Sequence, residues 1–263
     1  MEVLTPRSLD QALRMKAEHP SALPIQGGTD VMVALNFDAI RPDAILNLNE
    51  VAELRGFARE NGTVRLGAGL TYTELLQEPL AGALPALAEA SRTVGSPQIR
   101  NRGTIGGNLG TSSPAGDALP PLLVEGAELE VASMRGVRRV SLVDFIVGPK
   151  RNVLADDELI VAAVVEPSAE PQTFMKVGPR NAMVIAVCSL ALVADRERGK
   201  LRASFGSAGP VPGLVVAPLD AADDFPEQVV AAASPIDDVR GTAAYRLHSL
   251  RVLVRRALER CLV

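Results

Sequence analysis

The sequence predicts an α+β fold, in which two α+β subdomains are followed by a smaller C-terminal domain of antiparallel strands and helices. The 263 residues are enough for two ordinary domains. Short apolar or alternating runs, typical of strands, are mixed with amphipathic helical segments. Residues 164–172, VVEPSAEPQ, concentrate proline and acidic residues, as interdomain linkers do. We therefore expect one domain over residues 1–166, with subdomains of about 1–55 and 56–166, and a second over 172–263.

The first subdomain opens with a predicted helix over residues 8–19, where Ser8 and Gln11 fit a capping box. The apolar run ALPIQ follows it and ends at Gly27 and Gly28, which indicates a buried strand entering a tight loop. Asp30 then begins a second amphipathic stretch, VMVALN, and residues 44–48 predict another strand. Four apolar residues share one face of the first helix: Leu9, Ala12, Leu13 and Ala17.

The second subdomain begins with a predicted hairpin, because GFARE and TVRLGAG flank Asn61-Gly62, the dipeptide that best supplies positive φ in a two-residue turn. Helices are expected over residues 73–77 and 84–94. Asp117 is the candidate cap of a helix that runs to residue 124. Residues 95–116 are polar and glycine-rich without usable periodicity, and so long a loop inside a domain is more often functional than not. The segments ELEVAS, VRRVSL and ELIVAAVVE then predict strands.

Beyond the linker, the sequence predicts antiparallel strands and one long helix. QTFMKV, VIAVCSLALVAD and LRASFGSAG have the pattern of strands, and RERG forms a turn between the last two. The helix covers about residues 242–262. Its apolar face consists of Ala243, Leu247, Leu250, Val254, Ala257 and Cys261.

Composition excludes several function classes. The 27 Lys plus Arg against 31 Asp plus Glu give a net charge of −4, and the basic residues are scattered, which argues against nucleic-acid binding. No run of about 18 apolar residues occurs, so we expect a cytoplasmic protein that is not integral to a membrane. Cys188 and Cys261 are far apart, which indicates buried free thiols, because metal and iron–sulfur sites need clustered thiolates. We expect no metal in this chain, and a redox role would require an organic cofactor.

Two glycine-rich segments carry the functional signal: PIQGGTD, residues 24–30, and RNRGTIGGNLGTSSPAGD, residues 100–117. Adjacent glycines let the main chain approach a ligand closely, so that successive N–H groups can converge on phosphate oxygens. Thr29 or Asp30 would stand at a helix amino terminus, where the dipole favours an anion. Either segment alone could be an ordinary turn. A dinucleotide-binding Rossmann loop is excluded, because Tyr72 occupies the place of the third glycine after Gly67 and Gly69.

GGTD, followed about seventy residues later by QIRNRGTIGGNLGTSSPAGD, resembles the paired FAD-binding motifs of molybdenum hydroxylase flavoprotein subunits, the medium subunits of the xanthine dehydrogenase and carbon monoxide dehydrogenase superfamily. The resemblance covers essentially the whole chain, since DELIVAAVVE, FMKVGPRNAMVIAV, FGSAGPVP and VRGTAAYR match later family segments in order. It implies the PCMH/vanillyl-alcohol-oxidase-type fold, which the UDP-N-acetylenolpyruvoylglucosamine reductases share. TIGGN is quite specific within the longer string, whereas GGTD alone is not.

Carried over residue by residue, the resemblance implies two pyrophosphate loops and four further cofactor contacts. Two of these four contacts have an equal alternative that involves no cofactor. Ile160 would then be an ordinary core residue of a strand, and Lys176 a solvent-exposed residue of a strand. The first loop would consist of Gln26, Gly27, Gly28, Thr29 and Asp30, and the second of Thr104, Ile105, Gly106, Gly107 and Asn108. The further contacts would be Ser113, Asp117, Ile160 and Lys176.

The chain departs from the family pattern in the segment NAMVIA, residues 181–186, which lacks the aspartate of the family's Asp-Ile-Ala sequence. This departure puts the acceptor side of the site in doubt. The chain also has no aromatic residue obviously placed to stack on a flavin, since it contains only two tyrosines and six phenylalanines.

The function implied by the resemblance is electron transfer through FAD, with no catalytic acid, base or nucleophile in this chain. Electrons would come from [2Fe–2S] clusters on a small subunit, after hydroxylation at a molybdopterin site on a large subunit, in a complex that is a dimer of heterotrimers. The acceptor would be NAD, oxygen or a quinone-linked carrier. Two alternatives stay open: a stand-alone flavin reductase or oxidase of the same fold, and a scaffold subunit without cofactor.

Overall fold

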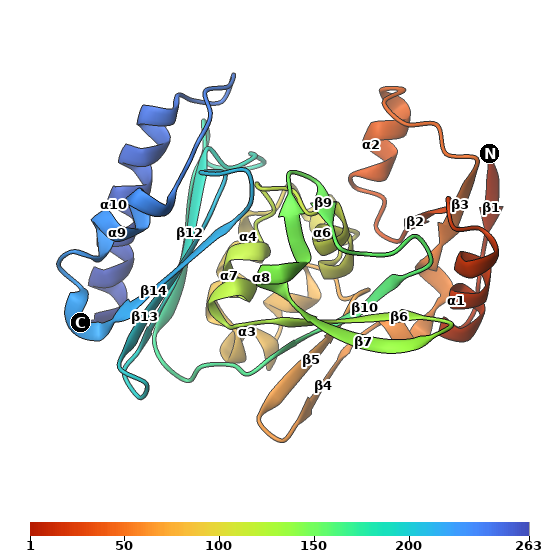
Figure 1. The fold of residues 1–263 in the computed structure, drawn as a ribbon, viewed down its shortest axis with the longest axis horizontal. Coiled ribbons are helices and arrows are strands. Elements are labelled where there is room, and N and C mark those ends of the chain that lie inside the picture. The colour runs from red at the N-terminus through yellow and green to blue at the C-terminus, as the bar shows by residue number, and fades with distance from the viewer. Residues whose placement is uncertain (263) are drawn as a thin grey trace.

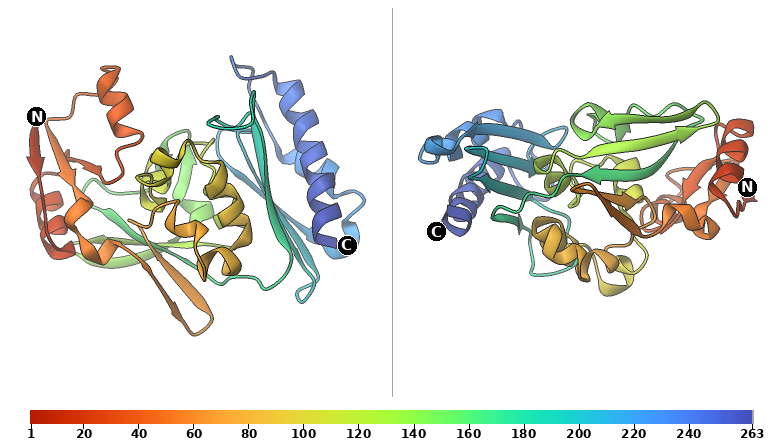
Figure 2. Two further views of the ribbon diagram at one scale, coloured as in Figure 1. Left: turned by 180° about the vertical axis from the view of Figure 1, so that it is seen from behind. Right: turned by 90° about the horizontal axis from the view of Figure 1, so that it is seen from below.

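Three larger β-sheets follow one another along the longest axis of the molecule, and the two termini lie near its opposite ends (Figures 1 and 2). A fourth sheet has only two strands and pairs residues 146–148 with residues 151–152. The computed structural model describes residues 1–262. The mixture of helices and strands confirms the predicted α+β fold class. No helix within the described residues is both long and apolar enough to cross a membrane.

The amino-terminal sheet is parallel, with the strand order β1-β3-β2. The predicted helix is α1, and Ser8 Oγ accepts a hydrogen bond from the Gln11 amide at 3.2 Å, as a cap should. The Gln11 side chain instead accepts from the amide of Arg7, one residue before the position a capping box requires. The next helix, α2, has no buried residue and projects from this sheet (Figure 1). These elements are β1 (Glu2–Leu4), α1 (Leu9–Glu18), β2 (Leu23–Ile25), α2 (Val31–Asn36) and β3 (Ala44–Asn47).

The central sheet is antiparallel along its length, in the order β4-β5-β10-β6-β7. Asn61 and Gly62 both have positive φ, of 51° and 85°, which confirms the predicted hairpin turn. The middle strand, β10, is buried at all seven positions, which explains its unbroken apolar sequence. Its bounds and those of its neighbours are β4 (Phe57–Glu60), β5 (Thr63–Gly67), β6 (Glu128–Ser133), β7 (Gly136–Ser141) and β10 (Leu159–Val165).

Short helices connect these strands, and three sequence predictions about them were wrong in detail. Residues 73–77 form only a 3-10 turn, Glu74–Leu76. The expected loop over residues 95–116 contains two helices, α5 and α6. Asp117 does not cap the following helix, α7, which begins after Ala118. The connecting elements are α3 (Leu80–Ala83), α4 (Pro85–Thr93), α5 (Pro97–Arg100), α6 (Ile105–Thr111), α7 (Leu119–Val124), α8 (Leu142–Phe145), β8 (Ile146–Gly148), β9 (Arg151–Asn152) and the 3-10 turns Leu48–Glu50 and Ala52–Leu54.

Helix α6 forms despite three glycines in its sequence IGGNLGT, a composition that disfavours helix. Tertiary packing compensates for that propensity, because Ile105 and Leu109, four residues apart, are both fully buried in the core. Thr104 caps the helix by accepting a hydrogen bond from the Gly107 amide at 3.0 Å. Because α6 depends on burial and on one cap, its own sequence shows little helical periodicity.

The C-terminal sheet is antiparallel in chain order, β11-β12-β13-β14, and is covered on both faces. Helices α9 and α10 pack on one face, whereas α4 and α7 of the preceding part cover the other (Figure 1). Helix α10 confirms the predicted long helix. The elements are β11 (Gln172–Val177), β12 (Cys188–Asp195), β13 (Lys200–Gly206), β14 (Gly213–Pro218), a 3-10 turn (Leu219–Ala221), α9 (Phe225–Ala232) and α10 (Ala243–Leu262).

Candidate functional site

The two glycine-rich segments line one cavity of about 420 Å³, although more than seventy residues separate them. This volume lies within the range of small-molecule sites. The first segment follows β2, and the second forms the start of α6. A third wall comes from the residues before and at the start of β10. The predicted residues that line the cavity are Gln26, Gly27, Gly28, Thr29, Asp30, Thr104, Gly106, Gly107, Asn108 and Ile160.

Close main-chain packing holds the two segments together. A Cβ on Gly27 would lie 2.1 Å from the carbonyl oxygen of Arg102, so only glycine fits there. The Arg102 guanidinium donates to the carbonyl oxygen of Gln26 at 3.3 Å. The hydroxyl of Thr111 donates to Asp30 Oδ2 at 2.8 Å, which links the end of α6 to the start of α2.

The first segment has main-chain donors with no partner. The five consecutive amides of residues 27–31 donate no hydrogen bond to any acceptor within residues 1–262. Gly28 has a φ of +74°, a left-handed conformation that favours glycine and turns the chain into α2. A row of free amides along a cavity wall is a site for an anion with several oxygens, such as a diphosphate.

The second segment differs, because its main-chain donors are already bonded within the protein. The Ile105 amide donates to Leu70 O at 3.0 Å, and the Gly106 amide donates to Ala68 O at 2.7 Å. The Gly107 amide donates to the Thr104 hydroxyl. The segment therefore contributes shape and side chains to the cavity, whereas the first segment contributes main-chain donors.

Asn108 carries a polar atom that lacks a partner. Its Oδ1 is buried and accepts no hydrogen bond within the described residues. A buried acceptor without a partner is costly in a folded protein, so this oxygen suits a ligand that brings a donor. Gly116 packs against this side chain, because a Cβ there would lie 2.9 Å from Oδ1.

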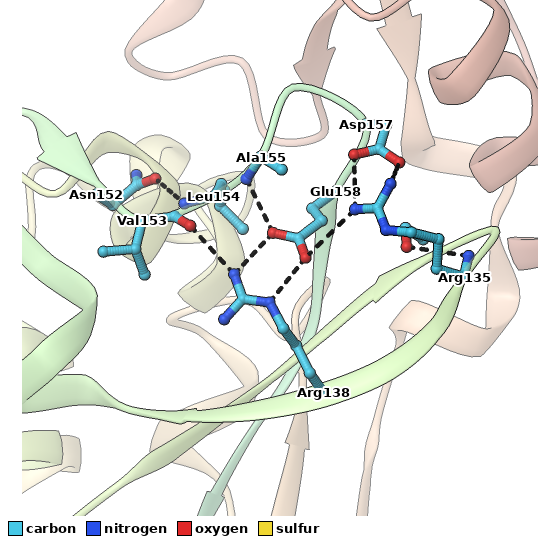
Figure 3. A network of polar contacts seen from close by, with 9 residues as sticks. Arg135, Arg138, Asn152, Val153, Leu154, Ala155, Asp157 and Glu158 are labelled. Atoms are coloured by element: carbon cyan, nitrogen blue, oxygen red, sulfur yellow. Dashed lines mark hydrogen bonds and ion pairs between the residues drawn. The ribbon is translucent and has the colours of Figure 1, made fainter.

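The third wall combines apolar side chains with one carboxylate. Leu154, Glu158, Leu159 and Ile160 line it, and Figure 3 shows the polar contacts behind it. Ile160 is 8% exposed and stands at an irregularity in the β10–β6 pairing. It is therefore both a strand residue and part of the cavity wall, so the two alternatives drawn from the sequence are compatible.

Four of the predicted contacts do not line the cavity. Ile105 is fully buried in the core. Ser113 Oγ accepts a hydrogen bond from the Ala115 amide. Lys176 Nζ donates to Asp117 Oδ2 at 2.6 Å and to the carbonyl oxygen of Thr93 at 3.3 Å, so this ion pair joins β11 to the start of α7. The role of all four at a cofactor stays a prediction.

Sequence reasoning did not assign Tyr72, Leu154 and Glu158 to the site, yet all three line the cavity. Tyr72 is 4% exposed and is the aromatic side chain that the sequence did not place. It follows β5, and its amide donates to Gly103 O at 3.1 Å, a contact across thirty residues that no local pattern reveals. For Glu158, the Asp-Glu-Leu motif was a usable signal, since it directly precedes Ile160.

Neither buried ionisable group of the cavity is set up for proton transfer near neutral pH. Burial raises the pKa of Tyr72, so its phenol stays protonated. The hydrogen bonds from Arg138 lower the pKa of Glu158, so this carboxyl stays ionised and paired. The cavity therefore offers binding surface and fixed polar groups instead of an acid or base.

The cavity fits FAD on three counts. The amides of residues 27–31 suit the pyrophosphate, and Asn108 Oδ1 suits a donor on the ring system or sugar. The apolar wall at Leu159 and Ile160 suits the faces of a planar ring. Each feature matches a different part of the same cofactor.

Known proteins resemble this chain over most of its length. Residues 1–167 match the family described as FAD binding domain in molybdopterin dehydrogenase. The chain is 31% identical over 270 residues to the xanthine dehydrogenase FAD-binding subunit of Escherichia coli O157:H7, covering 96% of this chain and 92% of that one. It is 27% identical over 282 residues to the carbon monoxide dehydrogenase medium chain of Hydrogenophaga pseudoflava, with 98% and 96% covered.

A solved structure of carbon monoxide dehydrogenase from Hydrogenophaga pseudoflava, in a form that lacks the Mo-pyranopterin moiety of its molybdenum cofactor, has the same fold. Its TM-score is 0.92 at 25% identity, covering 100% of this chain and 97% of that one. The likeness in fold therefore includes the C-terminal sheet and its helices as well as the elements that carry the cavity.

Proposed function

Since the chain belongs to the family of FAD-binding domains in molybdopterin dehydrogenases, we propose that it holds FAD in the cavity between the two glycine-rich segments and passes electrons through it. The electrons come from [2Fe–2S] clusters of a partner subunit and leave to an external acceptor. The observation that carries this proposal is the row of five unpartnered amides at residues 27–31, in a segment that lines the same cavity as Gly107 and Asn108.

The residues of this chain bind and position the cofactor. The amides of residues 27–31 would donate hydrogen bonds to the pyrophosphate, and Asn108 Oδ1 would accept one from a donor group of the cofactor. Leu159 and Ile160 exclude water from one side of the cavity. FAD supplies the one-electron and two-electron chemistry when bound, so the protein needs no nucleophile of its own.

The proposed assembly contains a small iron–sulfur subunit and a large molybdopterin subunit, arranged as a cytoplasmic dimer of heterotrimers. The family membership and the relatives named as subunits or chains of dehydrogenases support a multi-subunit oxidoreductase. The named relatives act on different substrates, xanthine and carbon monoxide. The substrate is therefore a property of the large subunit, and NAD, oxygen and a quinone-linked carrier are the acceptors to test.

The two rival functions make different predictions. A stand-alone flavin reductase or oxidase needs a proton-transfer group at its flavin, and the two buried candidates, Tyr72 and Glu158, are held in fixed protonation states. A scaffold without cofactor has no use for free amides in a cavity wall, or for a buried Asn108 Oδ1 without a partner in a residue of that wall.

Purification of the whole chain from its native complex tests the proposal. We expect a yellow protein that releases one FAD per chain on denaturation and that copurifies with an iron–sulfur and a molybdenum-containing polypeptide. A colourless chain that does not bind added FAD would refute cofactor binding. A yellow chain that reduces an acceptor alone, without partner subunits, would instead favour the stand-alone enzyme.

A further inference from the structure

The wall of the cavity near Ile160 depends on a segment without regular structure. Residues 153–158 connect β9 to β10, and Leu154 and Glu158 from this segment line the cavity. No helix or sheet ladder holds the segment, and its main chain has only isolated bonds, such as the Val153 amide donating to Phe145 O and the Glu158 amide donating to Ala155 O. Side chains from other elements therefore contribute to its path. Figure 3 shows these contacts.

One arginine contacts both ends of this segment. Arg138, on the edge strand β7, donates through Nη2 to the carbonyl oxygen of Val153 at 3.1 Å. Its Nε and Nη2 donate to the two carboxylate oxygens of Glu158, each at 2.7 Å. Glu158 Oε2 in turn accepts from the Ala155 amide at 2.8 Å. Arg138 thus closes residues 153–158 into a ring (Figure 3).

The burial of the two partners is unequal. The Glu158 side chain is 6% exposed and faces the cavity, whereas the Arg138 side chain is 42% exposed and covers it from outside. Loss of the guanidinium would leave the Glu158 carboxylate without its two hydrogen-bonded donors, with only the exposed Arg135 at 3.9 Å as a counter-charge, and would release the Val153 carbonyl. A buried charge that loses its partner drives rearrangement of the segment that carries it.

A neighbouring ion pair provides a matched control. Arg135, in the turn before β7, pairs with Asp157 of the same segment, and its side chain is 62% exposed. Arg135 Nη2 lies 3.9 Å from Glu158 Oε1, too far for a hydrogen bond. Arg135 therefore has the same charge as Arg138 and contacts the same segment, but it does not link the two ends of that segment.

We propose that Arg138 is a positioning residue for the cofactor site: through Glu158 and the Val153 carbonyl it fixes the cavity wall that Leu154, Leu159 and Ile160 form, and thereby the affinity for FAD. This inference rests on the proposed function. Arg138 does not line the cavity, so it acts through the segment that it holds.

The test compares Arg138→Met with Arg135→Met in the full chain, by titration of the FAD-free protein with FAD and by visible circular dichroism of the bound flavin. We expect Arg138→Met to weaken FAD binding roughly tenfold, equivalent to about 1.4 kcal/mol, and to change the dichroism. Arg135→Met should leave both unchanged. The double variant Arg138→Met/Glu158→Gln should recover part of the affinity, because no unpaired charge remains.

Hydrogen exchange separates this inference from the proposed function. In the FAD-free chain, residues 153–158 should lose protection in Arg138→Met and keep it in Arg135→Met, whether or not FAD binds. If wild-type protein binds no FAD, the proposed function fails, and the exchange contrast still decides whether the ring exists. If Arg138→Met retains wild-type affinity and exchange, the positioning role is refuted. Should Arg138→Met fail to fold, Arg138→Lys replaces it, and wild-type affinity there would also refute the role of the guanidinium fork.

Discussion

At the residue scale, the glycines of the two segments are required for different reasons. A Cβ on Gly106 would lie 2.7 Å from the carbonyl oxygen of Ala68, so that glycine is needed for folding. A Cβ on Gly107 would meet only the Thr104 hydroxyl, at 3.2 Å, and otherwise face the cavity. Gly107 is therefore the position where a substitution separates ligand binding from folding.

We predict that Gly107→Ala lowers FAD affinity while leaving the stability of the chain unchanged or higher. The methyl group enters cavity space, and alanine in place of a helical glycine favours α6 by up to about 1 kcal/mol. Fluorescence titration with FAD and thermal unfolding measure the two effects. Gly148→Ala is the control, because its Cβ would make only ordinary contacts, 3.7 Å from Arg151. Wild-type affinity in Gly107→Ala would contradict the assignment of this residue to the cofactor site.

Both cysteines should be unreactive in the native protein. Burial raises the pKa of Cys188 to about 12 and that of Cys261 to about 11. At pH 8, fewer than about one in a thousand of these thiols is a thiolate, so a disulfide reagent should label neither until denaturant is added. Rapid labelling of the native chain would show that one of these sites opens. Both cysteines are free and buried in the structure, as the sequence predicted.

At the scale of elements, α6 depends on its cap, because three of its seven residues are glycine. Thr104→Ala should destabilise the chain by about 1 kcal/mol, since the Gly107 amide loses its acceptor, whereas Thr104→Ser should retain most of that stability. Urea unfolding measures both. Ser8→Ala removes an equivalent cap from α1, which is remote from the cavity. We expect Ser8→Ala to destabilise the chain by a similar amount and to leave FAD bound. Loss of FAD in both Thr104→Ala and Ser8→Ala would therefore indicate general unfolding.

The 153–158 segment should lose stability in acid. Because Arg138 lowers the pKa of Glu158 below its ordinary value of about 4.3, this carboxylate stabilises the fold at higher pH, and the contribution disappears as pH falls through the lowered pKa. The free energy of unfolding, measured with denaturant between neutral pH and pH 3, should therefore fall less steeply for Glu158→Gln than for wild type. Identical pH profiles would show that the pair adds no stability.

At the scale of the whole molecule, a buried ion pair joins the cavity-bearing part to the C-terminal sheet. The side chains of Lys176 and Asp117 are 5% and 9% exposed and lie 2.6 Å apart. Lys176→Met would leave the Asp117 carboxyl buried without its partner, at a cost of about 3–5 kcal/mol. Burial already raises the pKa of this carboxyl, so loss of the lysine would favour its protonated form. Chemical denaturation should show this loss, and Lys176→Met/Asp117→Asn should recover much of it. A loss below 1 kcal/mol for the single variant would mean that water replaces the lysine.

The domain boundaries drawn from the sequence stay a prediction. The three larger sheets fall within residues 1–55, 56–166 and 172–263, and the two-stranded β8-β9 sheet falls within the second of these ranges. However, α4 and α7 cover one face of the C-terminal sheet, and Phe174 packs with Ala90 and Val124 in a shared cluster. We therefore expect the C-terminal domain to require the preceding part of the chain for its stability.

Local signals explain what could be predicted. The Ser8 cap, the Asn61-Gly62 turn and the apolar strand at β10 each depend on a few neighbouring residues, so their patterns could be read directly. Helix α6 could not be read, because its stability comes from burial of Ile105 and Leu109 against distant elements. Its glycines indicated a loop until tertiary packing was known.

The sequence by itself determined the fold class and the two glycine-rich segments, because turn chemistry and strand pattern are local properties. Only the tertiary structure shows that one segment contributes main-chain donors to the cavity and the other contributes shape and side chains. Only contacts between distant residues show that residues 27–31 keep free amides whereas Ile105 and Gly106 have theirs bonded. The same long-range packing brings Tyr72 and Glu158 to the cavity and places Arg138 behind Glu158. A hydrogen-bond partner or a neighbour across a cavity depends on the folded chain and on no single stretch of it.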